Sequence, residues 1–265
     1  MLTLEVEITR VDVRSKKASK MSDFVAEEKP LCIFINNKPY ATVFCSPSNL
    51  KEMTVGHLIS EGIAKSVKDI EEVSVRASKT VYSANVKSNI NVERRQKLLK
   101  SSYRIIRSAC GSSLPYSSLA KHPRIRSSLT IKAEMILNCV NRLNFSAEIF
   151  RKTGGVHVAT IYTTDGHVEA FAEDVGRHNA VDKVIGIGAL RGIDFSACFL
   201  AVSGRLTGDM VLKAARVGLP IVASLAAALD SGIAVAKEAG LTLVGFVRGN
   251  RMNVYTFPER ILQAN

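Results

Sequence analysis

Over residues 198–247 the sequence alternates short apolar runs with amphipathic stretches, and this alternation constrains the fold more than any other feature. The apolar runs have the length and the β-branched content of buried strands, and the stretches between them have helical apolar spacing. We expect strands at 198–202, 220–224 and 241–247, and helices at 208–217 and 230–239. Strands that alternate with helices at these lengths are typical of a largely parallel sheet covered on both faces.

A second stretch, residues 153–183, gathers more reactive side chains than any other part of the chain. Its first half alternates apolar and polar residues around Thr164-Asp165-Gly166, which predicts a β-hairpin. Residues 180–185 have helical spacing, so Asp174, Arg177 and His178 lie where a strand gives way to a helix. A salt-bridged helix start made of Glu173, Asp174 and Arg177, with His178 as a structural histidine, would explain each residue alone. As a group, these residues predict a functional site.

Polar and basic residues also follow the predicted strands of the alternating region. In such sheets ligands bind beyond the carboxyl ends of the strands. One strand end runs into Ser203-Gly204-Arg205, and another runs into Arg248-Gly249-Asn250-Arg251. The arginines can therefore converge, and the glycines permit a close approach of the backbone to a phosphate. Neither segment is a Walker loop or a GxGxxG motif, so this indication of a phosphate site is weak by itself.

The remaining segments predict further strands and helices. Residues 1–29 are polar and mixed in charge, so we expect one edge strand at 2–11 and a loose connection. Two strands are expected at 31–35 and 40–45 around Asn36-Asn37, because asparagine tolerates positive φ. The other predicted elements are the helix 49–63 with Gly62 near its C-cap, strand structure over 71–86, a short basic helix at 92–99, the helix 129–143, the strand 252–257 and a short terminal helix.

The net charge of +12 comes from one segment, residues 76–132. This segment contains thirteen lysines and arginines and one acid, Glu93, while the rest of the chain holds twenty-three of each sign. A local excess suggests a polyanionic partner (nucleic acid, an acidic protein or a ligand with several phosphates), beside the alternative of a merely solvated basic face. Aromatic residues are 6% of the chain and no DNA-binding or RNA-binding signature occurs, so we expect no nucleic acid partner.

Five cysteines, an odd number without short spacing, indicate a reducing compartment, and the cytoplasm is the natural one. Four of them fall in predicted strands or helices, where thiols are commonly buried and inert: Cys32, Cys45, Cys139 and Cys198. Cys110 lies instead in an irregular loop flanked by cations, which stabilise a thiolate, so it is the candidate nucleophile. Two alternatives for Cys110 stay open. It could be a surface cysteine without a role, or it could pair with His157 or His178 as in a Cys-His hydrolase.

Membrane and metal signatures are missing from the sequence. No window of about 18 apolar residues occurs, so we expect no transmembrane span. The N-terminus MLTLEVEITR carries acids and lacks the apolar segment of a signal peptide, so we expect no leader. His167-Val168-Glu169 has the H-x-E spacing of zinc deaminases, but no P-C-x-x-C follows, and we expect no metal site.

Four motifs together resemble those of the formate dehydrogenase accessory sulfurtransferase family. They are TGGVH from Thr153, EDVGRHNAVDK from Glu173, Ser203-Gly204-Arg205 and Gly245-Phe246-Val247-Arg248-Gly249, in the family's order and at similar spacing. The resemblance runs from about residue 30 to residue 261. It implies an α/β fold with a cytidine-deaminase-like three-layer domain at 129–265, with a mixed sheet, helices on both faces and no catalytic zinc. A smaller, mostly β portion at 1–128 would carry the basic segment and a mobile cysteine loop.

The resemblance also implies a function. Proteins of this family take sulfur from a cysteine desulfurase as a persulfide on a loop cysteine, which matches Cys110. They pass it to Mo-bis(molybdopterin guanine dinucleotide), the cofactor on which formate dehydrogenase activity depends, and a guanine nucleotide such as GDP would mimic part of that cofactor. The family's cofactor-binding run matches Phe246, Val247, Arg248, Gly249, Asn250 and Arg251. To this run we add the candidates from the other motifs, namely Ser203, Gly204, Arg205, His157, Asp174, Arg177 and His178.

The chain departs from the family in one place. Relatives often show C-G-x-C where this chain has Cys110-Gly111-Ser112-Ser113, so a second loop thiol is missing and a two-cysteine relay is in doubt. Two functions are therefore weighed. The first is a sulfurtransferase whose Cys110 thiolate attacks the donor's sulfane sulfur. The second is a carrier that protects and delivers the cofactor without transferring sulfur. A homodimer is the default assembly.

Overall fold

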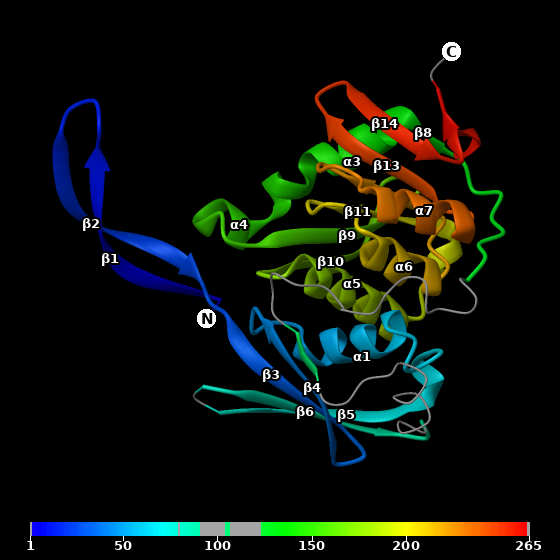
Figure 1. Ribbon diagram of the computed structural model, residues 1–265, viewed down its shortest axis with the longest axis horizontal. Helices are drawn as coiled ribbons and strands as arrows, with labels where there is room; N and C mark the ends of the chain where they lie inside the picture. Colours follow the sequence, from blue (N-terminus) through cyan, green and yellow to red (C-terminus); the bar gives the residue numbers. More distant parts are fainter. Residues whose placement is uncertain (1, 79, 91–103, 107–122, 264–265) are drawn as a thin grey trace.

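The computed structural model describes residues 2–78, 80–90, 104–106 and 123–263, and Figure 1 shows how their helices and strands are arranged. The helices are α1 (Leu50–Ser60), α3 (Ala133–Ser146), α4 (Glu148–Thr153), α5 (Arg177–Arg191), α6 (Gly208–Arg216) and α7 (Asp230–Ala239). The N-terminal strands are β1 (Thr3–Asp12), β2 (Lys17–Ala26), β3 (Lys29–Ile35), β4 (Lys38–Cys45), β5 (Ile70–Ala77), β6 (Tyr82–Ser88) and β7 (Arg104–Ile106). The remaining strands are β8 (Ile131–Lys132), β9 (His157–Thr163), β10 (Val168–Asp174), β11 (Cys198–Val202), β12 (Ile221–Ser224), β13 (Thr242–Arg248), β14 (Arg251–Thr256) and β15 (Ile261–Leu262).

The C-terminal half is built on a six-stranded sheet with the order β10-β9-β11-β12-β13-β14. Its centre, β11, β12 and β13, is parallel, whereas the other neighbours pair antiparallel. The largely parallel sheet expected from the alternation is therefore wrong, and the mixed sheet implied by the resemblance is confirmed. The reason is that the hairpins β9–β10 and β13–β14 add antiparallel strands at both edges.

Helices cover both faces of this sheet, because successive residues of a strand point to opposite sides. Leu200 and Val222 belong to the core on the side of α5, α6 and α7. Phe199 and Ala201 belong to the core on the side of α3. The mixed α/β fold with helices on both faces is thus confirmed, while its likeness to cytidine deaminases and the domain boundary at residue 128 stay predictions.

The N-terminal half has a sheet of its own, with the order β5-β6-β3-β4-β7, and α1 packs on it. The turn between β3 and β4 places Asn36 and Asn37 at φ 50° and 64°, as the sequence predicts. Gly62 follows the end of α1 with φ 72°, which also agrees with its expected place at the helix end. This half therefore follows its local sequence signals closely.

Helices α1 and α5 join the two halves at a close crossing. A Cβ added to Gly56 would lie 1.7 Å from the carbonyl oxygen of Asp182, and a Cβ added to Gly186 would lie 1.8 Å from that of Glu52. The two backbones can approach so closely only where both residues lack a side chain. The pair of glycines therefore sets the distance between the halves.

A buried ionic network lies beside this crossing. The Nζ of Lys213 lies 2.7 Å from Glu61 Oε1 and 2.8 Å from Asp182 Oδ1, and His57 Nδ1 lies 3.0 Å from Asp182 Oδ2. All four side chains are buried. Burial opposes the ionisation of Glu61, but the charges of Lys213 and His57 outweigh it and lower the pKa of Glu61 to about 2. The network ties α1 to α5 and α6.

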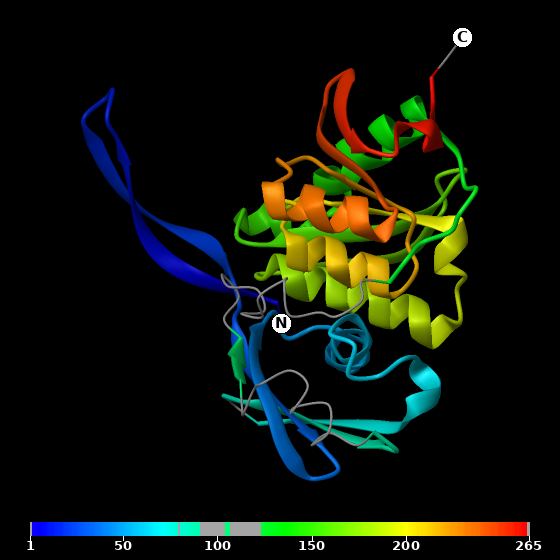
Figure 2. The same ribbon diagram turned by 45° about the vertical axis from the view of Figure 1, so that its right-hand side comes forward.

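Residues 3–26 form a hairpin that extends away from the rest of the chain, which we name the N-terminal arm (Figure 2). Its strands β1 and β2 pair antiparallel from Thr3 opposite Ala26 to Asp12 opposite Lys17. The expected loose connection after a single strand is therefore wrong. The sequence gives no signal for the second strand, because Lys17–Ala26 is polar and most of its residues are exposed.

Two further differences from expectation concern residues 129–153. α3 begins at Ala133 rather than at residue 129, because Ile131–Lys132 pairs with β15 as a short strand. α4 was not predicted, since its six residues are too few to show helical spacing. The predicted basic helix at 92–99 and the loop around Cys110 lie outside the described residues.

Candidate functional site

A pocket of about 430 Å³ lies where the ends of several sheet strands meet the loop after α4. All four sequence motifs contribute to it, through residues 154–157, Val175, Ser203 and Arg248. Its lining residues are Asn144, Phe150, Gly154, Gly155, Val156, His157, Val175, Ser203, Leu225, Ala226 and Arg248. The fold therefore brings together His157, Ser203 and Arg248, which follow one another at intervals of about 45 positions in the chain.

His157 and Ser203 form the polar centre of this pocket. Ser203 Oγ lies 3.3 Å from His157 Nδ1 and accepts a hydrogen bond from the Val158 N–H at 2.9 Å. Burial lowers the pKa of His157, and the nearby charges of Arg177, His178 and Arg205 lower it further. The imidazole is therefore neutral at pH 7, and it offers one donor and one acceptor nitrogen.

Two arginines from the predicted set stand close to His157. Arg177 is the first residue of α5, and its stem packs on Gly204, where an added Cβ would lie 3.0 Å from Arg177 Cβ. The Arg177 Nε is buried and has no hydrogen-bond partner in the part of the chain that the structure describes. Arg205 is exposed. An anionic group at this place would supply the acceptor that Arg177 lacks.

The predicted cofactor-binding run occupies the end of β13 and the turn into β14. Phe246 has φ 52°, a backbone conformation that costs energy for a residue with a side chain, and 36% of its surface is exposed. Arg248 lines the pocket, donates from Nε to the Leu225 carbonyl oxygen at 2.8 Å, and places its Cζ 5.7 Å from the centroid of the Phe246 ring. The guanidinium is thus held at the pocket while its other nitrogens remain available to a ligand.

The other residues of this run have different environments. Val247 is completely buried in the core beside α3, so its side chain cannot contact a ligand. Gly249 turns the chain with φ 56°, and its carbonyl oxygen accepts a hydrogen bond from Asn141 Nδ2 at 3.0 Å. Asn250 in the turn and Arg251 at the start of β14 are exposed, and neither lines the pocket.

Asp174 and His178 lie behind the pocket rather than on its surface. Asp174 is fully buried, with Oδ2 2.7 Å from Lys183 Nζ, and it accepts a hydrogen bond from the Ser46 N–H at 3.0 Å. His178 Nε2 lies 2.7 Å from Asp209 Oδ2. These contacts match the salt-bridged helix start that the sequence left open, so both residues brace the junction that carries Arg177.

Glu173 has a supporting role that the sequence did not reveal. Its buried carboxylate accepts hydrogen bonds from the N–H groups of Ile149 at 3.2 Å and Phe150 at 2.8 Å. It therefore caps the N-terminus of α4, and α4 in turn leads into residues 154–157 at the pocket. Asn144 and Phe150 also reach the pocket from this region without any local signal in the sequence.

The described cysteines agree with the expectation that most thiols of the chain are inert. Burial raises the pKa of Cys139 and of Cys198 to about 11, and it raises the pKa of Cys45 as well. Cys32 is half-buried in β3, with Sγ 3.4 Å from Thr42 Oγ1. Cys110, the predicted nucleophile, lies outside the described residues.

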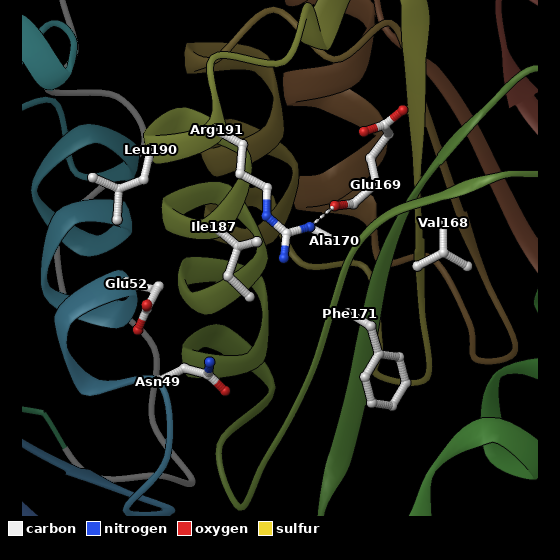
Figure 3. Close-up of a pocket in the computed structure, with 9 residues that line it drawn as sticks. All are labelled: Asn49, Glu52, Val168, Glu169, Ala170, Phe171, Ile187, Leu190 and Arg191. Atoms are coloured by element: carbon white, nitrogen blue, oxygen red, sulfur yellow. Dashed lines mark hydrogen bonds between the residues drawn. The ribbon is translucent and has the colours of Figure 1, made fainter.

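A second pocket, of about 420 Å³, lies between α1, α5 and β10 (Figure 3). Arg191 Nη1 donates to the Glu169 carbonyl oxygen at 2.7 Å there, and Asn49, just before α1, and Glu52 on α1 also line the pocket. None of the predicted site residues lines this pocket. We therefore assign the candidate site to the first pocket.

The fold and the site define a mixed α/β protein with an arginine-bearing pocket at the strand ends of its larger sheet. The chain belongs to the FdhD/NarQ family, whose model matches residues 26–262. It is 38% identical to the sulfur carrier protein FdhD of Sulfolobus acidocaldarius over 258 residues, which cover 97% of this chain and 98% of that protein. It is 32% identical to the protein of the same name from Staphylococcus aureus, over 94% of this chain and 93% of that protein.

A solved structure extends this likeness to three dimensions. It belongs to a protein from Desulfotalea psychrophila that is assigned as a formate dehydrogenase accessory protein. The two chains superpose with a TM-score of 0.80 at 28% sequence identity, over 99% of this chain and 100% of the other. The family resemblance carried by the four motifs is therefore confirmed.

Among residues 2–78, 80–90, 104–106 and 123–263, no helix has the length and apolar character to span a membrane. In the same residues, no three side chains of His, Cys, Asp or Glu are grouped so that they could hold a metal ion.

Proposed function

We propose that this chain is a sulfurtransferase that carries sulfur as a persulfide to Mo-bis(molybdopterin guanine dinucleotide), the cofactor of formate dehydrogenase. Its relatives are named sulfur carrier proteins, and the solved relative is described as a formate dehydrogenase accessory protein. The observation in this chain that carries the proposal is the meeting of His157, Ser203 and Arg248 in one pocket.

The chemistry of the pocket suits a phosphorylated ligand. Arg248 lines it, Arg177 and Arg205 lie close to His157, and guanidinium groups bind phosphate oxygens in pairs. The neutral His157 and the Ser203 hydroxyl add uncharged hydrogen-bonding groups. A volume of about 430 Å³ is that of a site for one small ligand, so the pocket would hold one guanine nucleotide end of the larger cofactor, with GDP as a partial mimic.

The sulfur chemistry is assigned to Cys110. Its thiolate would attack the outer sulfur of a persulfide on a cysteine desulfurase, so that a new S–S bond forms on Cys110 and the donor leaves as a thiolate. On delivery, the outer sulfur leaves Cys110 for the molybdenum, and a thiol reductant supplies the two electrons that convert sulfane sulfur to sulfide. Such chemistry needs a reducing compartment, so we place the protein in the cytoplasm.

Complementation tests this proposal. We expect Cys110→Ser to abolish formate dehydrogenase maturation while GDP binding is retained, because the thiol carries sulfur and the pocket binds nucleotide. Cys32→Ser is the matched control, since this half-buried strand thiol has no role in transfer. Ser113→Cys should be tolerated, because it restores the C-G-x-C spacing of relatives. Full maturation of formate dehydrogenase by the Cys110→Ser variant would contradict sulfur transfer by this chain. It would favour the alternative, a carrier that delivers the cofactor without transferring sulfur.

A further inference from the structure

Asn144 occupies a position on α3 where the helical pattern calls for an apolar side chain. Ile136 and Val140 precede it at intervals of four residues, and both are completely buried. Residues four apart lie on the same face of a helix, so the core-facing row of α3 ends on an amide. Because the predicted helix ends at residue 143, only the structure shows that Asn144 continues this row. Asparagine is also a poor helix former, so neither packing nor helix propensity accounts for this residue.

The side chain of Asn144 lines the first pocket with an unpaired acceptor. Its Oδ1 is buried and receives no hydrogen bond from the part of the chain that the structure describes. Among the described residues that line this pocket, no other buried side-chain nitrogen or oxygen is left without a partner. A buried acceptor without a donor costs free energy, so such an atom at a pocket indicates a ligand that donates to it.

The donor cannot come from the phosphates of a nucleotide. Arg248 lines the same pocket, and Arg177 and Arg205 stand close by, so phosphate oxygens are matched by guanidinium groups. An ionised phosphate oxygen is itself an acceptor and would repel the amide oxygen of Asn144. The part of the nucleotide that faces Asn144 must therefore carry an N–H or an O–H, which leaves the base and the sugar.

The surroundings favour the base over the sugar. Phe150, on α4, lines the pocket together with Val156 and Leu225, so apolar side chains accompany the amide. A flat base suits such walls, because its faces are apolar and its hydrogen-bonding groups lie along its edge. Guanine carries two donors side by side on one edge, the ring N1–H and the 2-amino group, whereas adenine has an acceptor nitrogen and a C–H there. An acceptor at this edge therefore selects guanine.

We propose that Asn144 is the residue that selects guanine, because its Oδ1 accepts a hydrogen bond from the 2-amino group of the base. This inference rests on the proposed function, which supplies the guanine nucleotide. The position of α3 is fixed by Asn141, one turn before Asn144, which donates from Nδ2 to the Gly249 carbonyl oxygen at 3.0 Å. That hydrogen bond joins α3 to the turn after Arg248, so the side chain that reads the base and the arginine keep a defined spacing.

Calorimetry of the full chain with three nucleotides tests the proposal. GDP, IDP and 2′,3′-dideoxy-GDP share the diphosphate, but IDP lacks the 2-amino group and the dideoxy compound lacks both sugar hydroxyls. We expect the wild-type protein to bind IDP about tenfold or more weakly than GDP, because IDP leaves the Asn144 oxygen without a partner. The dideoxy compound should bind like GDP.

Variants of Asn144 assign the preference to this side chain. Asn144→Leu has a similar volume and no acceptor, so it should bind GDP and IDP with equal affinity. Asn144→Asp keeps an acceptor oxygen and should still prefer GDP. Asn138→Leu, at an exposed position of the same helix, is the matched control and should keep the wild-type preference.

The outcomes separate this inference from the proposed function. A wild-type protein that binds none of the three nucleotides would contradict the proposed function itself. Equal affinity of the wild type for GDP and IDP, or a preference for GDP that Asn144→Leu retains, would overturn only the role of Asn144. A loss of affinity confined to the dideoxy compound would also overturn it, because the amide oxygen would then bind the sugar.

Discussion

Replacing Lys213 with methionine removes the cation that balances two buried carboxylates. In the folded protein its Nζ contacts Glu61 at 2.7 Å and Asp182 at 2.8 Å, and the Ser60 hydroxyl lies 3.0 Å away. Methionine has a similar volume, so the change deletes the charge and leaves little cavity. Breaking a buried ion pair on one side costs about 3–5 kcal/mol, because the remaining charge is uncompensated. In a chain of this size that loss corresponds to a melting temperature lower by about 6–20 °C.

The loss should depend on pH in a defined direction. In the wild type the folded-state pKa of Glu61 is about 2, below its ordinary value of 4.5, so its contribution is present above about pH 4.5 and disappears as the pH falls toward 2. Without Lys213, only His57 opposes the effects of burial and of the Asp182 charge on Glu61, so the folded-state pKa of Glu61 rises and acid destabilises the variant less than the wild type. The difference in melting temperature between wild type and Lys213→Met is therefore largest near pH 7 and shrinks below pH 4.5.

Thermal unfolding followed by circular dichroism at pH 7 and at pH 4 measures both effects. Lys237→Met is the matched control, because Lys237 is exposed on α7 and its loss should change stability by less than about 0.5 kcal/mol. A Lys213→Met protein that melts within 2 °C of the control at pH 7 would refute the reasoning, on the scale of about 2–4 °C per kcal/mol. A loss that grows as the pH falls would refute the assigned sign.

Two further changes test the pocket and the helix crossing. Arg248→Ala should weaken GDP binding about tenfold or more in calorimetry, because a charge-assisted hydrogen bond is worth about 1.5–3 kcal/mol. Arg191→Ala, at the second pocket, is the control and should leave the affinity for GDP unchanged. An unchanged affinity of Arg248→Ala would remove Arg248 from the site. Gly56→Ala should destabilise the fold by about 3 kcal/mol or more in urea unfolding, because its Cβ would meet the Asp182 carbonyl oxygen. Lys51→Ala, at an exposed position of the same helix, is its control, and equal stability of the two variants would contradict the close crossing.

The elements that the sequence predicts well are those with a strong local pattern. β11 and α7 have the predicted bounds, and the β9–β10 hairpin surrounds the predicted turn at Gly166, which has φ 87°. The elements that were missed depend on contacts with distant parts of the chain. Ile131–Lys132 becomes a strand only by pairing with β15, and α4 is a six-residue helix held by the carboxylate of Glu173.

The site shows the same division between local and distant signals. The strand ends predicted that Ser203 and Arg248 would lie at the edge of the sheet, and both line the pocket there, because a residue after a buried strand reaches the edge of the sheet whatever surrounds it. Periodicity could not show that Asp174 and His178 would be buried against Lys183 and Asp209. Buried ion pairs are created by the packing of helices, and a single sequence does not record which helices meet.

The most direct test of the central claim is the intact mass of the protein after incubation with a cysteine desulfurase and cysteine. The account predicts a gain of one sulfur atom per chain, which a thiol reductant removes. The gain should be lost in Cys110→Ser and kept in Cys32→Ser. The same gain in Cys110→Ser, or no gain in the wild type, would contradict the assignment of sulfur transfer to Cys110.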